Sequence, residues 1–328
     1  MKITIYRISV LLILVTSFLA ACTPGEVKGP PDEVTVQLKW IHQAQFAGFY
    51  VPDKKGFYAE ENINVTLNAG SPSISPDTMI SDLASGETDF AIVGGDILLY
   101  ARSVGKPLVA IAVIFQRNPR VYVTLKDSGI IRPQDLVGKK VMIPNDGIIQ
   151  HDVLLNKLGI AEDSIELIPY ERDIKPLTTG LIDAHMLYRT GLALAFGEAG
   201  YELNFIWVDN YGIRFYADTI ITTERMVVEN PDLVERFLRA TLKGWRYAIE
   251  HSAEAVDITL QYDATLARDR QMRMMEVQTP LIHTGKSELG WMDRSVWDKM
   301  QNLLLEEEIE IDKAFTMQFL NEIYSKTD

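Results

Sequence analysis

The chain has 328 residues, of which 45 are acidic and 32 are Lys or Arg, so its formal net charge at pH 7 is −13. This balance argues against nucleic acid as a partner, because binding to phosphates needs a basic surface. The sequence has one cysteine, which excludes an internal disulfide, and 47% hydrophobic residues, which can supply a packed core instead.

The N-terminal segment has the pattern of a bacterial lipoprotein signal. Basic residues precede an apolar run that ends in Leu19-Ala-Ala, and the single cysteine, Cys22, follows directly. The run is shorter than the roughly 20 apolar residues that a membrane-spanning helix needs. We therefore predict a signal peptide over residues 1–21 and a lipid on Cys22. That lipid would hold the protein at the cell membrane, on the extracytoplasmic face.

Residues 22–33 are rich in Pro, Gly and charge, and they predict a tether. Strand-like and helix-like patterns then alternate, which favours βαβ units with parallel strands. The first set of predicted strands is 34–40, 63–68, 90–93 and 108–115, with helices at 46–58, 77–84 and 96–104.

A second α/β unit follows the first. Its predicted strands are 121–125, 140–143, 165–169, 184–188 and 205–208, and its helices are near 147–158, 173–181 and 190–199. After a strand at 219–223, the chain is predicted to be helical near 230–249, 252–262, 267–276, 293–306 and 316–325.

Turn-forming residues near 117–120 and 209–215 suggest that the chain crosses twice between two lobes. We expect residues 34–118 and 216–328 to form the first lobe and residues 119–215 to form the second. The predicted fold class is therefore α/β, with two lobes and two crossings.

Ligands of open α/β sheets bind beyond the carboxyl ends of the strands. Residues at these ends, on the helices that follow, or at the crossings are therefore candidate ligand contacts, and several are aromatic. The candidates are Trp40, Gln43, Phe46, Tyr50, Gly70, Gly94, Asp96, Asn118, Asn145, Tyr188 and Tyr211. Phe46 and Tyr50 share one helix face, which could equally belong to the core, and Gly94 could serve only a tight turn.

The sequence offers no catalytic constellation. The five histidines show no zinc spacing, and no G-x-S-x-G motif is present. We therefore expect a protein that is not an enzyme, with no cofactor and no metal.

Several segments resemble the solute-binding proteins of ABC importers, in the group related to fungal thiamine-pyrimidine synthesis proteins. The similar segments are Gln37-Leu-Lys-Trp40, Gln45-Phe-Ala-Gly-Phe-Tyr50, Lys55-Gly-Phe-Tyr-Ala-Glu-Glu61, Leu83-Ala-Ser-Gly-Glu-Thr-Asp89, Tyr211-Gly-Ile-Arg-Phe-Tyr-Ala-Asp218 and residues 230–245. The resemblance implies a type II periplasmic-binding-protein fold, permease and ATPase partners, and a small planar N-heterocycle as ligand. The fungal relatives are enzymes with a Cys-rich motif, which this chain lacks.

Two departures from the pyrimidine-binding members bear on the ligand. Pro52 stands where those proteins continue a helix, and we expect it to break or kink that helix. After Tyr188 they carry a carboxylate within a few residues, whereas the first acid here is Glu198. A buried amino group without an acceptor costs roughly 1–3 kcal/mol. These differences favour riboflavin slightly over a thiamine-pyrimidine precursor, formylaminopyrimidine or hydroxymethylpyrimidine. A lipid-anchored sensor without transport is the alternative class.

Overall fold

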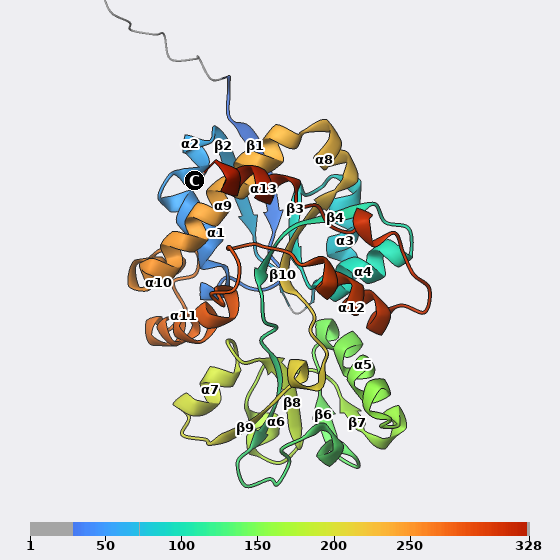
Figure 1. Cartoon of the computed structure of the whole chain (residues 1–328). Coiled ribbons are helices and arrows are strands. Elements are labelled where there is room, and N and C mark those ends of the chain that lie inside the picture. The colour runs from blue at the N-terminus through green and yellow to red at the C-terminus, as the bar shows by residue number, and fades with distance from the viewer. Residues whose placement is uncertain (1–28, 72, 327–328) are drawn as a thin grey trace, which may run out of the picture.

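The two predicted α/β units each form a five-stranded sheet, and Figure 1 shows them as an upper and a lower lobe joined by two chain segments. This computed structural model describes residues 29–71 and 73–326. The predicted signal peptide, Cys22 and most of the predicted tether lie outside the described residues.

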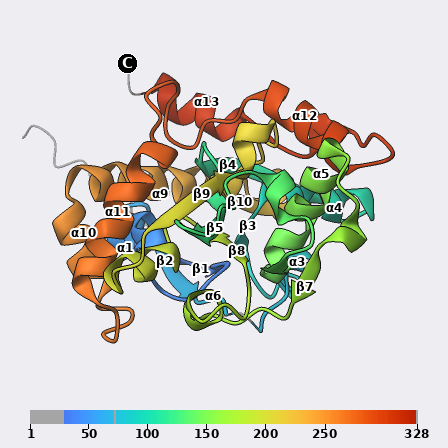
Figure 2. The ribbon, with the colours of Figure 1, turned by 90° about the horizontal axis from the view of Figure 1, so that it is seen from below.

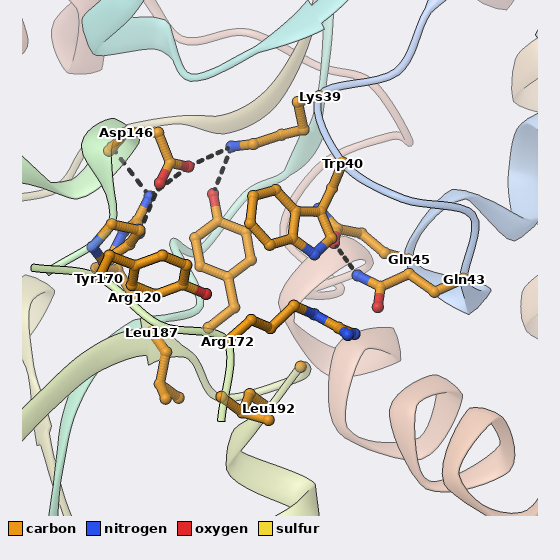
Figure 3. A pocket seen from close by; sticks show the side chains of 13 residues that line it. Lys39, Trp40, Gln43, Gln45, Arg120, Asp146, Tyr170, Arg172, Leu187 and Leu192 are labelled. Atoms are coloured by element: carbon orange, nitrogen blue, oxygen red, sulfur yellow. Dashed lines mark hydrogen bonds and ion pairs between the residues drawn. The ribbon is translucent and has the colours of Figure 1, made fainter. Parts of the chain in front are cut away.

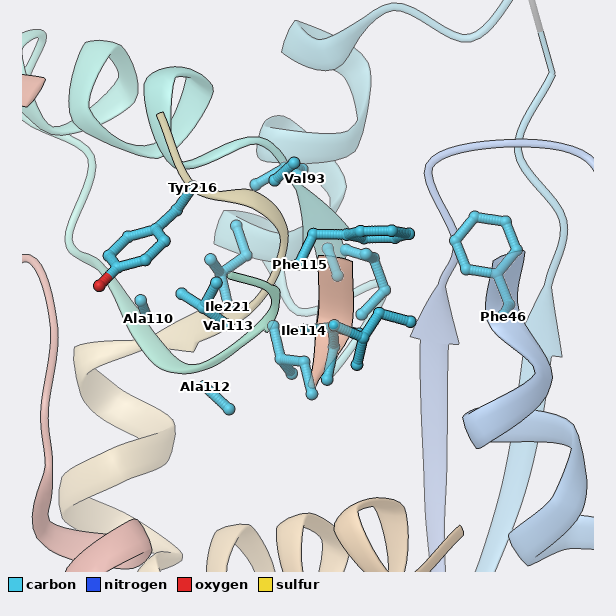
Figure 4. Packing of buried hydrophobic residues seen from close by; sticks show 14 of the residues in the cluster. Phe46, Val93, Ala110, Ala112, Val113, Ile114, Phe115, Tyr216 and Ile221 are labelled. Atoms are coloured by element: carbon cyan, nitrogen blue, oxygen red, sulfur yellow. The ribbon is translucent and has the colours of Figure 1, made fainter. Parts of the chain in front are cut away.

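The sheet of the upper lobe has the strand order β2-β1-β3-β10-β4. Strands β1, β2 and β3 are parallel, whereas β10 runs antiparallel to both β3 and β4. The bounds are β1 Asp32–Gln37, β2 Ile63–Asn68, β3 Phe90–Val93, β4 Leu108–Phe115 and β10 Ala217–Thr223. Every residue of β4 is buried, and Figure 4 shows its side chains packed within the core of this lobe.

The sheet of the lower lobe has the order β7-β6-β8-β5-β9 and follows the same plan. Strands β6, β7 and β8 are parallel, and β5 runs antiparallel to both β8 and β9. The bounds are β5 Arg120–Leu125, β6 Lys140–Met142, β7 Glu166–Ile168, β8 Ala184–Tyr188 and β9 Leu203–Trp207. In each sheet, the strand beside the three parallel ones, β10 or β5, is the one that has just crossed from the other lobe.

Helices surround both sheets (Figure 2). The lower lobe has α5 Ile148–Leu158, α6 Lys175–Thr178 and α7 Ala193–Glu198. The upper lobe has α1 Ala47–Lys54, α2 Phe57–Glu60, α3 Pro76–Ser85, α4 Gly95–Ser103, α8 Glu224–Glu229, α9 Pro231–Glu250, α10 Ser252–Thr259, α11 Arg268–Ile282, α12 Arg294–Leu304 and α13 Gln318–Ser325. None of these described helices has an apolar stretch that could cross a bilayer.

Several local predictions differ from the structure. The predicted helix 46–58 is divided into α1 and α2 by Gly56, whose φ of 78° ends the regular helix. Pro52 itself lies inside α1, which continues to Lys54. The first predicted strand extended to Trp40, but β1 ends at Gln37, so the next residues leave the sheet.

Helices α1 and α9 pack so closely that each needs a glycine at the contact. An ideal Cβ on Gly48 would lie 2.0 Å from the Trp245 ring, and one on Gly244 would lie 2.4 Å from Pro52. Trp245 is fully buried at this contact. The glycines therefore set the distance between the two helices, and any added side-chain atom must displace a buried ring.

We predict that Gly48→Ala lowers the free energy of unfolding by about 2 kcal/mol or more, because overpacking a rigid core is costly. Urea denaturation measures the change. Gly197→Ala on α7 is the matched control, since no atom lies within 4 Å of its ideal Cβ. It should be neutral or stabilising by up to about 1 kcal/mol. Equal stability of the two variants would contradict this account of the α1–α9 contact.

Two histidines are buried in the lower lobe. The Nδ1 atom of His151 on α5 lies 2.6 Å from the Tyr122 hydroxyl oxygen. His185 on β8 packs against the edge of Tyr170, and neither of its ring nitrogens has a hydrogen-bond partner among the described residues. Burial lowers the pKa of each histidine from 6.5 to about 4. Both side chains are therefore neutral in the folded protein at neutral pH.

These histidines should make the protein less stable in acid. Between about pH 6.5 and pH 4 the unfolded chain takes up protons that the folded chain does not, so stability falls as the pH falls through this window. The loss is on the order of 3 kcal/mol per histidine at full extent. Urea denaturation at pH 7.5 and pH 4.5 should show a smaller loss for His185→Phe than for the parent. The control is His283→Phe, which changes an exposed histidine and should lose as much stability as the parent. If His185→Phe also loses as much stability as the parent between pH 7.5 and pH 4.5, buried His185 is not a cause of the acid sensitivity.

Candidate functional site

The parallel strands of both sheets end at one gap between the lobes. After β1 come Lys39 and Trp40, after β2 comes Ser71, and after β3 comes Gly94. From the lower lobe, the segments after β6, β7 and β8 supply residues from Pro144 to Asp146, Tyr170 and Arg172, and Gly191 and Leu192. All six parallel strands therefore contribute to the lining, as expected for an α/β ligand site.

The gap consists of two adjoining hollows. The polar hollow encloses about 530 Å³, open solvent included, and is lined by groups such as Gln43, Gln45, Arg120, Arg172 and Tyr188. The apolar hollow encloses about 830 Å³, open solvent included, and is lined by side chains such as Ile74, Met79, Val93 and Ile97. Lys39, Trp40, Pro144, Asp146 and Tyr170 line both. The hollows thus form one continuous cleft between the lobes.

The ammonium group of Lys39 connects the two lobes across this cleft. Its Nζ donates to the Tyr188 hydroxyl at 2.9 Å and lies 3.4 Å from an Asp146 carboxylate oxygen, both on the lower lobe. On the upper lobe it lies 3.6 Å from Asp218. Figure 3 shows Lys39 reaching toward Asp146. Only 8% of the Lys39 side chain is exposed, so these partners replace most of the water around the charge.

Arg120 supplies a second buried cation at the start of β5. Its Nη2 donates to the Asp146 carboxylate at 2.9 Å and to the Asp146 carbonyl at 3.1 Å. The guanidinium also lies over the Tyr188 ring, 4.6 Å from its centroid, and the Lys39 ammonium lies 4.9 Å from the same centroid. Arg120 therefore holds the ring face by cation–π attraction, and Lys39 holds its hydroxyl end by a hydrogen bond.

The pKa values of the two carboxylates move in opposite directions. Burial would raise the pKa of Asp146, but Arg120 and Lys39 outweigh it and hold that pKa well below its usual range. Burial raises the pKa of Asp218, and its contacts with Lys39 and Gln45 only partly oppose the rise. Burial also lowers the pKa of Lys39, yet Tyr188, Asp218 and Asp146 together place it above its ordinary value. Lys39 and Asp146 are therefore a charged pair at neutral pH.

Asp218 adopts an unusual backbone conformation next to this pair. Its φ is 48°, in the left-handed region that non-glycine residues rarely occupy, and the residue is 2% exposed. Gln45 donates to its second carboxylate oxygen at 2.7 Å, and Gln43 donates to Gln45 at 2.7 Å. Such strain persists where surrounding contacts fix it, and here it directs the carboxylate toward Lys39.

Helix α11 holds the segment that carries Gln43 and Gln45. The backbone N–H of Ala44 donates to the Gln271 side chain at 2.8 Å, and the Gln278 side chain donates to the Ala44 carbonyl at 2.8 Å. Both α11 glutamines are buried. The two cleft glutamines are therefore fixed in position by the C-terminal half of the chain.

The structure brings five of the predicted candidates together at the cleft. Trp40, Gln43 and Tyr188 line the polar hollow, and Trp40, Gly94 and Asn145 line the apolar hollow. Tyr188 is held between Lys39 and Arg120, as described above.

The other candidates lie outside the lining. Phe46 and Tyr50 are fully buried, and Tyr50 stacks on Tyr262 within the upper lobe. Gly70 packs against the backbone of residues 38–40, where an added Cβ would lie 2.5 Å from a main-chain carbon. It therefore positions the segment that carries Lys39 and Trp40.

Three further candidates lie along the hinge or away from the cleft. Asp96 and Asn118 are buried behind it, with 1% and 5% of each residue exposed. Tyr211 lies in the short helix Val208–Tyr211 at the second crossing and lines neither hollow.

Sequence reasoning missed most of the charged residues at the cleft. Arg120 and Asp218 each stand at the beginning of an antiparallel strand, so locating them requires the strand direction, which residue periodicity does not give. Lys39 was adjacent to the selected Trp40, and Asp146 was adjacent to Asn145. Their position next to a selected residue at a strand end was the signal that could have identified Lys39 and Asp146.

The described residues contain no group of three or more His, Cys, Asp or Glu side chains arranged to hold a metal ion. The groups at the cleft instead offer ring faces, amide hydrogen bonds, the paired charges of Lys39, Arg120 and Asp146, and the Arg172 guanidinium. This arrangement can bind a flat, hydrogen-bonding molecule by stacking and polar contacts.

The family model described as "NMT1/THI5 like" matches residues 43–255. The riboflavin-binding protein RibY of Chloroflexus aurantiacus is 24% identical, with 98% of each chain covered. The formylaminopyrimidine-binding protein of Halalkalibacterium halodurans is 23% identical and covers 93% of this chain and 96% of its own.

Among solved structures, the periplasmic aliphatic sulphonate binding protein SsuA of Escherichia coli superposes with a TM-score of 0.69 at 12% identity. The superposition covers 86% of this chain and 91% of that one. The predicted two-lobed periplasmic-binding-protein fold is confirmed.

Proposed function

Because the chain belongs to the NMT1/THI5-like family, we propose that it is the solute-binding protein of an ABC importer and that it captures a planar N-heterocycle. The observation that carries the proposal is the cleft where all six parallel strands end. Trp40 from the upper lobe and Tyr170 and Tyr188 from the lower lobe line it together. Rings from both lobes can enclose a flat ligand when the lobes close.

The form of the cleft supports riboflavin over a single pyrimidine ring as the proposed ligand. The two hollows adjoin, so a ligand can place a fused aromatic ring against Ile74, Met79 and Ile97 in the apolar hollow. A hydroxylated chain can then extend past Trp40 into the polar hollow, where Gln43 and Arg172 lie. The riboflavin-binding relative, aligned over 98% of each chain, also supports this ligand.

The charges in the cleft also favour riboflavin over an aminopyrimidine. An aminopyrimidine needs a free acceptor for its amino group, as a carboxylate provides. Asp146 is already paired with Arg120 and Lys39, and Asp218 accepts from Gln45 and lies beside Lys39. A thiamine-pyrimidine precursor, formylaminopyrimidine or hydroxymethylpyrimidine, remains the second candidate on the strength of the formylaminopyrimidine-binding relative.

The proposed action is capture and release without chemistry. The lobes rotate about the two crossings, enclose the ligand and present it to a permease driven by its ATPase. A lipid-anchored sensor would use the same cleft without a permease. Permease and ATPase genes adjacent to the gene for this chain would favour import, and their absence would favour sensing.

A panel of ligands tests the proposed specificity. Riboflavin, hydroxymethylpyrimidine, formylaminopyrimidine and taurine are each added to the protein, and the melting temperature is recorded. We expect riboflavin to raise it most, because a ligand that binds only the folded state stabilises that state. Riboflavin fluorescence should be quenched as well. A shift with a pyrimidine, and neither shift nor quenching with riboflavin, would replace the flavin with the second candidate.

Trp40→Ala should weaken riboflavin binding by about tenfold or more, since a ring stack and its buried area are lost together. Trp291→Ala removes a tryptophan that lines neither hollow and should leave the dissociation constant unchanged. Fluorescence titration measures both. If Trp40→Ala binds riboflavin as tightly as the parent, Trp40, which follows the first strand, does not belong to the binding site.

We further propose that the mature protein is anchored by lipid on Cys22. Expression of the full chain in a bacterial host, followed by separation of membrane and soluble fractions, tests this. The parent should be found with the membranes, and Cys22→Ser should be found in the soluble fraction, because the thioether cannot form without the thiol. A membrane-bound Cys22→Ser protein would mean that something other than this lipid holds the chain.

A further inference from the structure

A line of buried polar side chains runs behind the cleft along the hinge. Asp96 begins α4 of the upper lobe, Gln150 lies on the first turn of α5 of the lower lobe, and Asn118 lies on the first crossing. The three residues are 1%, 3% and 5% exposed, respectively. None of them lines either hollow, so they do not contact a ligand there.

Hydrogen bonds join these residues to both crossings and both lobes. The Asn118 amide donates to the carbonyl of Phe215 on the second crossing at 3.1 Å and to Gln150 Oε1 at 3.3 Å. Gln150 Nε2 then donates to Asp96 Oδ2 at 2.8 Å. The other Asp96 oxygen accepts from the backbone N–H of Ile97 at 3.0 Å.

The Gln150–Asp96 bond is the step of this line that spans the lobes. Asn118 lies on the hinge itself and stays near both crossings, but Gln150 and Asp96 move with different lobes. Separation of the lobes therefore breaks this bond and exposes the Asp96 carboxylate to water. Closure remakes a buried bond with a carboxylate acceptor, which is among the stronger kinds.

An amide is the side-chain group that this position requires. Gln150 accepts from Asn118 with its oxygen and donates to Asp96 with its nitrogen. A carboxylate in its place would keep the first bond, lose the second and put two negative charges in contact. An apolar side chain of the same length would lose both.

Other polar contacts between the lobes differ from this one. Glu198 on α7 pairs with Arg270 and Arg273 on α11, but those arginine side chains are 39% and 43% exposed and solvated. The contacts of Lys39 lie inside the cleft, where a ligand touches them.

We propose that Gln150 is a positioning residue that holds the closed form of the protein through its bond to Asp96. It sets the fraction of molecules that are closed, and the apparent affinity of the cleft scales with that fraction. The ligand part of this inference rests on the proposed function, whereas the closure part does not.

Gln150→Glu tests the proposal, with Gln134→Glu on an exposed face of the same lobe as the matched control. Small-angle X-ray scattering of the ligand-free protein should give a larger radius of gyration for Gln150→Glu than for the parent and the control. Riboflavin should dissociate about tenfold faster from Gln150→Glu, since an open cleft releases its ligand more readily.

The double variant D96N/Q150E provides a rescue. The new amide at position 96 can donate to the new carboxylate at position 150, so the same bond forms with donor and acceptor exchanged. Its radius of gyration should return to that of the parent. Its riboflavin dissociation rate should return to within about threefold of the parent rate. If Gln150 only stabilised the fold, the second charge change would not restore the radius of gyration and the dissociation rate. If Gln150→Glu does not fold, Gln150→Met takes its place, because it also removes the donor.

Equal radii for parent and Gln150→Glu, or a folded double variant that remains as open as Gln150→Glu, would overturn the proposal. If riboflavin does not bind the parent, the flavin assignment fails, and the scattering comparison still decides whether Gln150 holds the closed form.

Discussion

The buried ammonium group of Lys39 is the contact on which the arrangement of the cleft depends. It lies between Asp218 on its own lobe and Asp146 and Tyr188 on the other, at distances of 2.9 to 3.6 Å. A buried charge is costly unless its partners are well placed, so each of these groups must be held in position. The strained backbone of Asp218 and the bonds through Gln45 serve that purpose on one side. Arg120 serves it on the other.

This balance of charge also shapes what the cleft can recognise. Asp146, which lines both hollows, is already paired with Lys39 and Arg120. What remains for a ligand is ring surface, amide groups, the Arg172 guanidinium and an apolar hollow. These groups are the basis of the proposed preference for a flat, elongated molecule.

The hinge contains a second buried polar network, in which the donors are side-chain amides. Asn118 ties the two crossings together, and Gln150 joins them to the carboxylate of Asp96. Two polar networks thus join the lobes in this structure, one in the cleft and one behind it.

The sequence by itself determined the alternation of strands and helices, the two α/β units, and the choice of Trp40 and Tyr188 as cleft residues, because periodicity and turn residues are local signals. It could not separate Phe46 and Tyr50 from the cleft, since a core face and a ligand face show the same helical spacing. Only the tertiary structure placed Lys39 beside Asp218, 179 positions later in the chain, and Gln150 beside Asp96. Those contacts depend on strand direction and on the packing of one lobe against the other, which no local pattern encodes.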